Sequence, residues 1–86
     1  MPEKFIPYNK WVNKKTQDNF ANFLSDNMGK DCAVYYLFEC INTGNTTKYP
    51  NGIAFSRNNG DYCTVKYKKT KQDGIDGLLF TYEFMD

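Results

Sequence analysis

Hydrophobic and polar positions divide the chain into a helical segment followed by strands. Over residues 16–28 the apolar side chains recur with the spacing of an amphipathic helix. The stripe comprises Phe20, Phe23, Leu24, Asn27 and Met28. Thr16 is a suitable N-cap and Gly29 a suitable residue just past the C-terminus. We therefore predict a helix over residues 16–28, with an earlier start near Lys10 as the alternative and residues 1–9 as an extended lead-in.

A different pattern begins at residue 32. The stretch CAVYYLFECI, residues 32–41, carries apolar side chains at both odd and even positions. A strand with two apolar faces is typical of the centre of a sheet, or of a strand with one face awaiting a partner. We predict a strand here, with Val34 and Phe38 on one face and Tyr35 and Leu37 on the other. A turn over residues 42–45 and a short run over residues 46–49 follow.

The next segment predicts a hairpin whose register can be derived. Asn58, Asn59 and Gly60 can close a two-residue or a three-residue loop. The three-residue loop pairs residue 57 with 61, 55 with 63, and 53 with 65. This register places an ion pair between Arg57 and Asp61 at the end of the hairpin and apolar pairs behind it. The two-residue loop mixes apolar with polar partners, so we predict the first register.

The remaining strands follow from the same alternation. Tyr67 continues the inward face of residues 63 and 65, while Lys66 and Lys68 point outward. A loop is predicted over residues 69–77 and a final strand over residues 78–85. The inward positions of that strand are Leu78, Phe80, Tyr82 and Phe84, and the outward positions are Leu79, Thr81, Glu83 and Met85.

Together these elements predict a single α+β domain over residues 1–86. Its N-terminal helix packs on one face of a four- to five-stranded antiparallel sheet, in an α-β-β-β-β meander. The predicted core residues are Phe20, Phe23, Leu24, Val34, Phe38, Val65 and Phe80. Seven Phe, seven Tyr and one Trp supply enough apolar surface for a compact core in a chain this short.

Charge and composition change this picture in one respect. Residues 64–74, TVKYKKTKQDG, hold four of the ten lysines, yet the formal net charge of the chain is only +1. With a single arginine and ten asparagines, the composition indicates an AT-rich genome in which lysine is the default cation. We therefore interpret the lysine cluster as the solvated end of a strand, whose charges also protect a sheet edge from aggregation.

The residue types exclude most catalytic chemistry. The chain has no histidine, so His-based general bases, Ser-His and Cys-His pairs and imidazole metal sites are absent. The three cysteines lack CxxC spacing and no phosphate-binding glycine motif occurs, so no metal or cofactor is expected. On a strand Cys32 and Cys40 would be about 26 Å apart, too far for a disulfide. Free cysteines, and an N-terminus unlike a secretory signal, predict a cytoplasmic protein.

Two enzyme alternatives stay open at this stage. Glu39 and Glu83, both predicted on strands, could form a pair of catalytic carboxylates on the open sheet face. A nuclease that works through lysines, tyrosines and Arg57 also remains open, and it is the class that we keep.

The outward sheet face is the candidate site. The predicted partner-binding residues are Tyr35, Leu37, Tyr62, Lys66, Lys68, Leu79 and Met85. Apolar anchors among charges of both signs are typical of protein-binding surfaces. The leading hypothesis is a small non-enzymatic protein that binds and inhibits or modulates another protein. Its composition is consistent with a phage or mobile-element product that acts on a host nuclease or defence complex, as anti-CRISPR proteins do.

Two alternatives use the same face. A single-stranded nucleic-acid-binding module would stack bases on Tyr35 and Tyr62, while lysines follow the phosphates. A homodimer would bury the two-sided strand over residues 32–41 against its copy. We favour the monomer, because the dimer interface would desolvate Glu39 and Glu83. Ordinary surface, with scattered exposed apolar residues, remains the alternative to any binding site.

Overall fold

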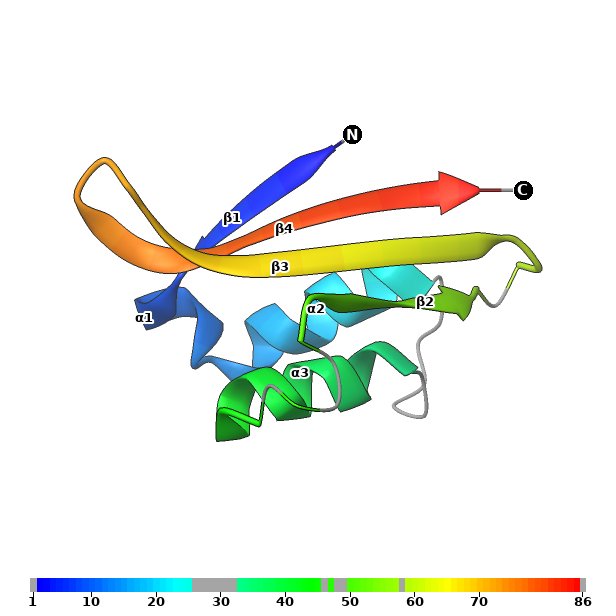
Figure 1. Ribbon diagram of the computed structural model, residues 1–86, viewed down its shortest axis with the longest axis horizontal. Helices are drawn as coiled ribbons and strands as arrows, with labels where there is room; N and C mark the ends of the chain where they lie inside the picture. The colour runs from blue at the N-terminus through cyan, green and yellow to red at the C-terminus, as the bar shows by residue number, and fades with distance from the viewer. Residues whose placement is uncertain (1, 26–32, 46, 48–49, 58, 86) are drawn as a thin grey trace.

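Three helices lie on one side of a four-stranded antiparallel sheet in a computed structural model that describes residues 2–25, 33–45, 47, 50–57 and 59–85 (Figure 1). The elements are β1 (Glu3–Pro7), α1 (Tyr8–Trp11), α2 (Lys14–Ser25), α3 (Ala33–Thr43), β2 (Gly52–Ser56), β3 (Tyr62–Gln72) and β4 (Ile75–Met85). The strand order is β1-β4-β3-β2. The predicted α+β class, a helix packed with a four-stranded antiparallel sheet, is confirmed.

Helix α2 is the helix that the apolar stripe predicts, although it begins earlier. Asn13, not Thr16, caps its N-terminus, since the Asn13 Oδ1 atom accepts a 2.9 Å hydrogen bond from the Lys15 N–H. Phe20 and Leu24 turn into the core, where they are 3% and 0% exposed. The predicted continuation over residues 26–28 and the terminating Gly29 lie outside the described residues.

The prediction of a strand over residues 32–41 is wrong, because this segment forms α3. Val34, Leu37 and Phe38 are buried and Ile41 is half-buried. These positions follow i, i+3, i+4 and i+7, which is one face of a helix. The Val, Tyr and Phe content favours a strand by propensity, but a helix in this place buries a single stripe against the sheet and leaves Tyr36 and Glu39 in solvent.

The α3 assignment also removes the basis of three sequence arguments. No two-sided strand remains to support the dimer. The argument that Cys32 and Cys40 are too far apart for a disulfide assumed a strand, so it no longer applies. Cys32 itself lies outside the described residues. Glu39 is now on a helix and Glu83 on β4, so these two carboxylates do not form the predicted pair on the sheet face.

Polar contacts join the three helices below the sheet. The Trp11 indole N–H donates to Asn42 Oδ1 at 2.8 Å, and the Gln17 side-chain amide donates to the Trp11 carbonyl oxygen at 2.7 Å. The Trp11 ring packs 4.9 Å from Phe38 and 5.3 Å from Phe80, centroid to centroid. Trp11 therefore connects α1 to the other helices and to β4 in one contact cluster.

The predicted hairpin register is confirmed. Ile53 pairs with Val65 and Phe55 with Cys63 in the β2–β3 ladder. Arg57 and Asp61 close it with a backbone hydrogen bond of 2.7 Å and a side-chain ion pair of 3.0 Å. Gly60 has φ +97°, the left-handed conformation that the three-residue loop requires.

The loop predicted over residues 69–77 is much shorter in the structure. Strand β3 continues to Gln72 and β4 begins at Ile75, so only Asp73 and Gly74 form the turn, with φ of +51° and +78°. Two consecutive positive φ angles are typical of the Asp-Gly type I′ turn, which keeps both strands in register to the end. The hairpin consequently extends beyond β1 and β2 (Figure 1).

The N-terminal lead-in is itself a strand. Residues of β1 pair with β4 from Glu3↔Thr81 to Pro7↔Gly77, which places β1 at one edge of the sheet and β2 at the other. The short run over residues 46–49 lies mostly outside the described residues.

The core lies between the helices and the sheet. Of the predicted core residues, all but Phe23 are buried. The Phe23 side chain is 49% exposed, because it lies at the flank of α2 that faces the β1 edge of the sheet, where no further described element covers it.

Candidate functional site

The sheet face opposite the helices is open to solvent in the described part of the chain. Figure 1 shows α1, α2 and α3 together on the other side of the sheet. Cross-strand register places the outward side chains in rows. The predicted site residues on this face are Tyr62, Lys66 and Lys68 from β3 and Leu79 and Met85 from β4.

The apolar part of this face consists of two cross-strand groups. Tyr62 pairs with Met85, and their side chains are 54% and 42% exposed. In the second group, further along the sheet, the half-buried Leu79 lies between Lys68 on β3 and Phe5 on β1. Large apolar side chains this exposed are the kind of anchors that bury area in a protein interface.

Charges of both signs share this face with the apolar residues. Lys66 and Lys68 are exposed on β3, Glu83 is exposed on β4, and Glu3 is exposed on β1. Lys66 pairs across the sheet with Thr81, which pairs in turn with Glu3. None of these four side chains forms an ion pair with another described residue. Their charges are therefore available to a partner.

Two predicted site residues lie elsewhere, because residues 33–43 form a helix. Leu37 is 0% exposed in the core and cannot contact a partner directly. Tyr35 is half-buried on α3, where its hydroxyl donates a 3.0 Å hydrogen bond to Asp18 Oδ1 on α2. Neither shares a face with Tyr62.

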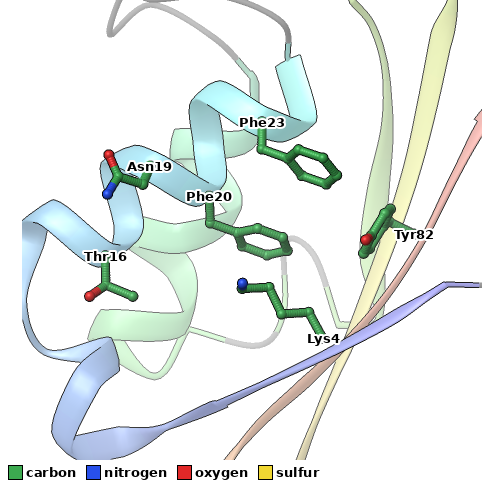
Figure 2. A pocket seen from close by; sticks show the side chains of 6 residues that line it. All are labelled: Lys4, Thr16, Asn19, Phe20, Phe23 and Tyr82. Atoms are coloured by element: carbon green, nitrogen blue, oxygen red, sulfur yellow. The ribbon is translucent and has the colours of Figure 1, made fainter.

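A second surface feature was missed by the sequence analysis. A cleft of about 400 Å³ lies between α2 and the β1–β4 side of the sheet (Figure 2). Its lining residues are Lys4, Thr16, Asn19, Phe20, Phe23 and Tyr82. Phe23 and Tyr82 meet edge to face at 5.4 Å, and the Lys4 ammonium lies 5.8 Å from the centroid of the Phe20 ring.

The electrostatics of the cleft are simple. Lys4 contributes the one charge in its lining, since the other five lining side chains are neutral. No described carboxylate pairs with Lys4. The sequence signal that could have indicated the cleft is the position of Phe23 at the edge of the α2 stripe, but only the placement of β1 brings Lys4 beside it.

The described thiols offer no reactive centre on these surfaces. Cys63 is 0% exposed between sheet and helices. Burial raises the pKa of the Cys63 thiol to about 11, and Asp61 adds to this effect while Arg57 opposes it. Cys40 is a free, half-buried thiol on α3. Among the described residues, no three Cys, Asp or Glu side chains gather as a metal-binding group.

Comparisons with protein-family models, with curated proteins and with solved structures found no match to this chain. Within the described residues, no helix combines the length and the apolar character needed to cross a membrane. The two surfaces must therefore be interpreted from their own geometry.

Proposed function

We propose that this protein is a small non-enzymatic binding protein, whose open sheet face contacts another protein and inhibits or modulates it. The observation that carries the proposal is the exposed Tyr62–Met85 pair on a sheet face that also carries the charges of Glu83, Lys66 and Lys68, unpaired among the described residues. The sheet fixes the backbone from which these side chains project, so little backbone conformational entropy is lost when a partner docks. Mixed charges favour a protein surface over a polyanion.

The biological setting is part of this proposal. A small domain with no catalytic motif, and with an amino-acid composition that indicates an AT-rich genome, suits a phage or mobile-element product that acts in a host cytoplasm. A host nuclease or defence complex is the kind of target that such a product would block. Binding alone, without turnover, is enough for that role.

The test of the proposal compares two equally exposed tyrosines. Tyr62 lies on the open sheet face and Tyr36 on α3, with exposed fractions of 54% and 59%. A partner is first captured from a lysate of the source or host cell and purified. Its affinity for Tyr62→Ala should then fall by at least about tenfold, while Tyr36→Ala should bind as the parent chain does. Equal affinities of the two variants would refute the role of this face.

Single-stranded nucleic acid is the second candidate for the same face. The observation that favours it is that Tyr62, Lys66 and Lys68 lie on the same face of β3, since bases stack on aromatic rings while lysines follow the phosphates. Tyr35, the second expected stacking residue, lies on α3, and Glu3 and Glu83 oppose a polyanion on this face. A labelled oligonucleotide that fails to bind at about 50 mM salt would remove this candidate, because such binding is strongest at low salt.

A further inference from the structure

The outer edge of β1 has backbone groups that no described strand pairs with. The Pro2 carbonyl oxygen accepts a 3.1 Å hydrogen bond from the Tyr82 N–H. Because backbone groups of alternate residues in a strand point to the same side, residues 4 and 6 also face β4. Glu3 and Phe5 therefore direct their N–H and C=O groups away from the sheet, where no described strand pairs with them. Such an edge can take one more strand.

The inward side chains of an added strand would reach the cleft beside α2. The register of β1 places Pro2 next to Tyr82 and Lys4 next to Phe80. In an antiparallel neighbour of β1, the residues opposite Lys4 and Pro2 would have their side chains on the helix side of the sheet. Figure 2 shows the Lys4 side chain extending from β1 toward α2, with its ammonium by the Phe20 ring and with Phe23 and Tyr82 further along the cleft.

The chemistry of the cleft indicates which residue types an added strand would place opposite Lys4 and Pro2. The Lys4 ammonium has no described acidic partner, so an acidic residue is favoured opposite it. The residue opposite Pro2 would meet the Phe23 and Tyr82 rings, so an aromatic or large aliphatic residue is favoured there. In an antiparallel strand the acidic residue comes first and the apolar residue follows two positions later.

We propose that β1 and the cleft form a peptide-binding site, which adds an extended acidic-x-apolar segment of a partner protein as a fifth, antiparallel strand. Main-chain hydrogen bonds to Glu3 and Phe5 hold the peptide, and the cleft selects its side chains. The site goes beyond the open sheet face of the proposed function. The two are tested by different side chains, Tyr62 on the open face and Phe23 and Lys4 in the cleft, so each can fail without the other.

A synthetic peptide tests the site with the full chain. The probe is acetyl-Thr-Val-Thr-Asp-Thr-Phe-Thr-amide, titrated into isotope-labelled protein and followed by amide chemical shifts and hydrogen exchange. The expected result is saturable shifts along β1 and α2, with slower exchange of the Glu3 and Phe5 amides. Absence of shifts at millimolar peptide, or shifts that map away from β1 and α2, would overturn the proposal.

Two altered peptides separate strand addition from simple side-chain capture. Methylation of the backbone nitrogen of the threonine between Asp and Phe removes the N–H that pairs with the Glu3 carbonyl oxygen but keeps every side chain, and it should abolish binding. Exchanging Asp with the threonine that follows it turns the carboxylate to the opposite face, and it should weaken binding by about fivefold or more. If the methylated peptide binds as well as the parent peptide, strand addition is excluded.

Matched protein variants complete the test. Phe23→Ala and Lys4→Gln change side chains in the cleft, and each should weaken peptide binding by about fivefold or more. The melting temperature of Lys4→Gln should stay near that of the parent, whereas Phe23→Ala loses ring contacts to Tyr82 and Phe84 and should melt lower, so its binding is measured well below its melting temperature. Tyr62→Ala, on the open sheet face, should leave peptide affinity unchanged. A loss with Tyr62→Ala, or none with Phe23→Ala and Lys4→Gln, would contradict the location of the site.

Discussion

At the scale of single residues, the one arginine of the chain has a clear structural role. The Arg57 Nε atom donates to the Leu24 carbonyl oxygen in the last described turn of α2 at 3.0 Å, and a terminal nitrogen contacts Asp61 at 3.0 Å. The guanidinium also lies 4.0 Å from the centroid of the Phe84 ring. A lysine cannot make these three contacts at once, because it has no planar group with several fixed donors.

We therefore expect Arg57→Lys to lower the free energy of unfolding by about 1–3 kcal/mol, measured by urea denaturation. Lys71→Ala is the matched control, since its 3.9 Å ion pair with Asp76 is solvent-exposed and should change stability by less than about 0.5 kcal/mol. If the two variants were equally stable, Arg57 would not anchor α2 to the hairpin.

The buried thiol of Cys63 predicts a dependence on pH. Burial raises its pKa in the folded state to about 11 from an ordinary value of 9.0. The unfolded chain therefore loses this proton first as pH rises. The contribution to stability is complete below about pH 9 and is lost between pH 9 and 11. Two pKa units limit the effect to less than about 3 kcal/mol.

The measurement compares the parent chain with Cys63→Ala. Stability should fall more for the parent than for the variant between pH 8.5 and about pH 11, since other groups titrate equally in both. In a Cys32→Ser/Cys40→Ser chain, the remaining thiol should react with a thiol reagent only after denaturation. Rapid labelling in the folded state would show that Cys63 is not buried.

At the scale of elements, the pair Tyr36 and Leu37 distinguishes a helix from a strand over residues 33–43. Strand alternation would turn Tyr36 inward with Val34 and Phe38 and leave Leu37 in solvent. In α3 the order is reversed, with Leu37 0% exposed and Tyr36 59% exposed.

Leu37→Ala should therefore cost about 2–5 kcal/mol of unfolding free energy, and Tyr36→Ala less than about 0.5 kcal/mol, in the same urea assay. The opposite order of the two costs would favour the strand. This pair thus tests the largest difference between the sequence prediction and the structure.

At the scale of the whole molecule, all described helices cover one sheet face, and this decides where binding surfaces can be. One face of the sheet is left to solvent with Tyr62 and Met85, and the edge strand β1 is left with a cleft beneath it. The prediction for Tyr62→Ala therefore concerns the open face alone. The predictions for Phe23→Ala and Lys4→Gln concern the edge alone, so the two surfaces can be tested independently.

Local alternation along the chain determined the class of the fold, the α2 stripe, the β2–β3 register and the outward positions of Lys66 and Lys68. These features depend on contacts between near neighbours in sequence, which side-chain periodicity reports directly. Residues 33–43 satisfy both a strand and a helix by pattern, and only packing against the sheet selects the helix. That choice buried Leu37 and moved Tyr35 away from the predicted site. The cleft likewise needed the tertiary structure, because Lys4 and Phe23 come together only when β1 pairs with β4, a contact between the two ends of the chain.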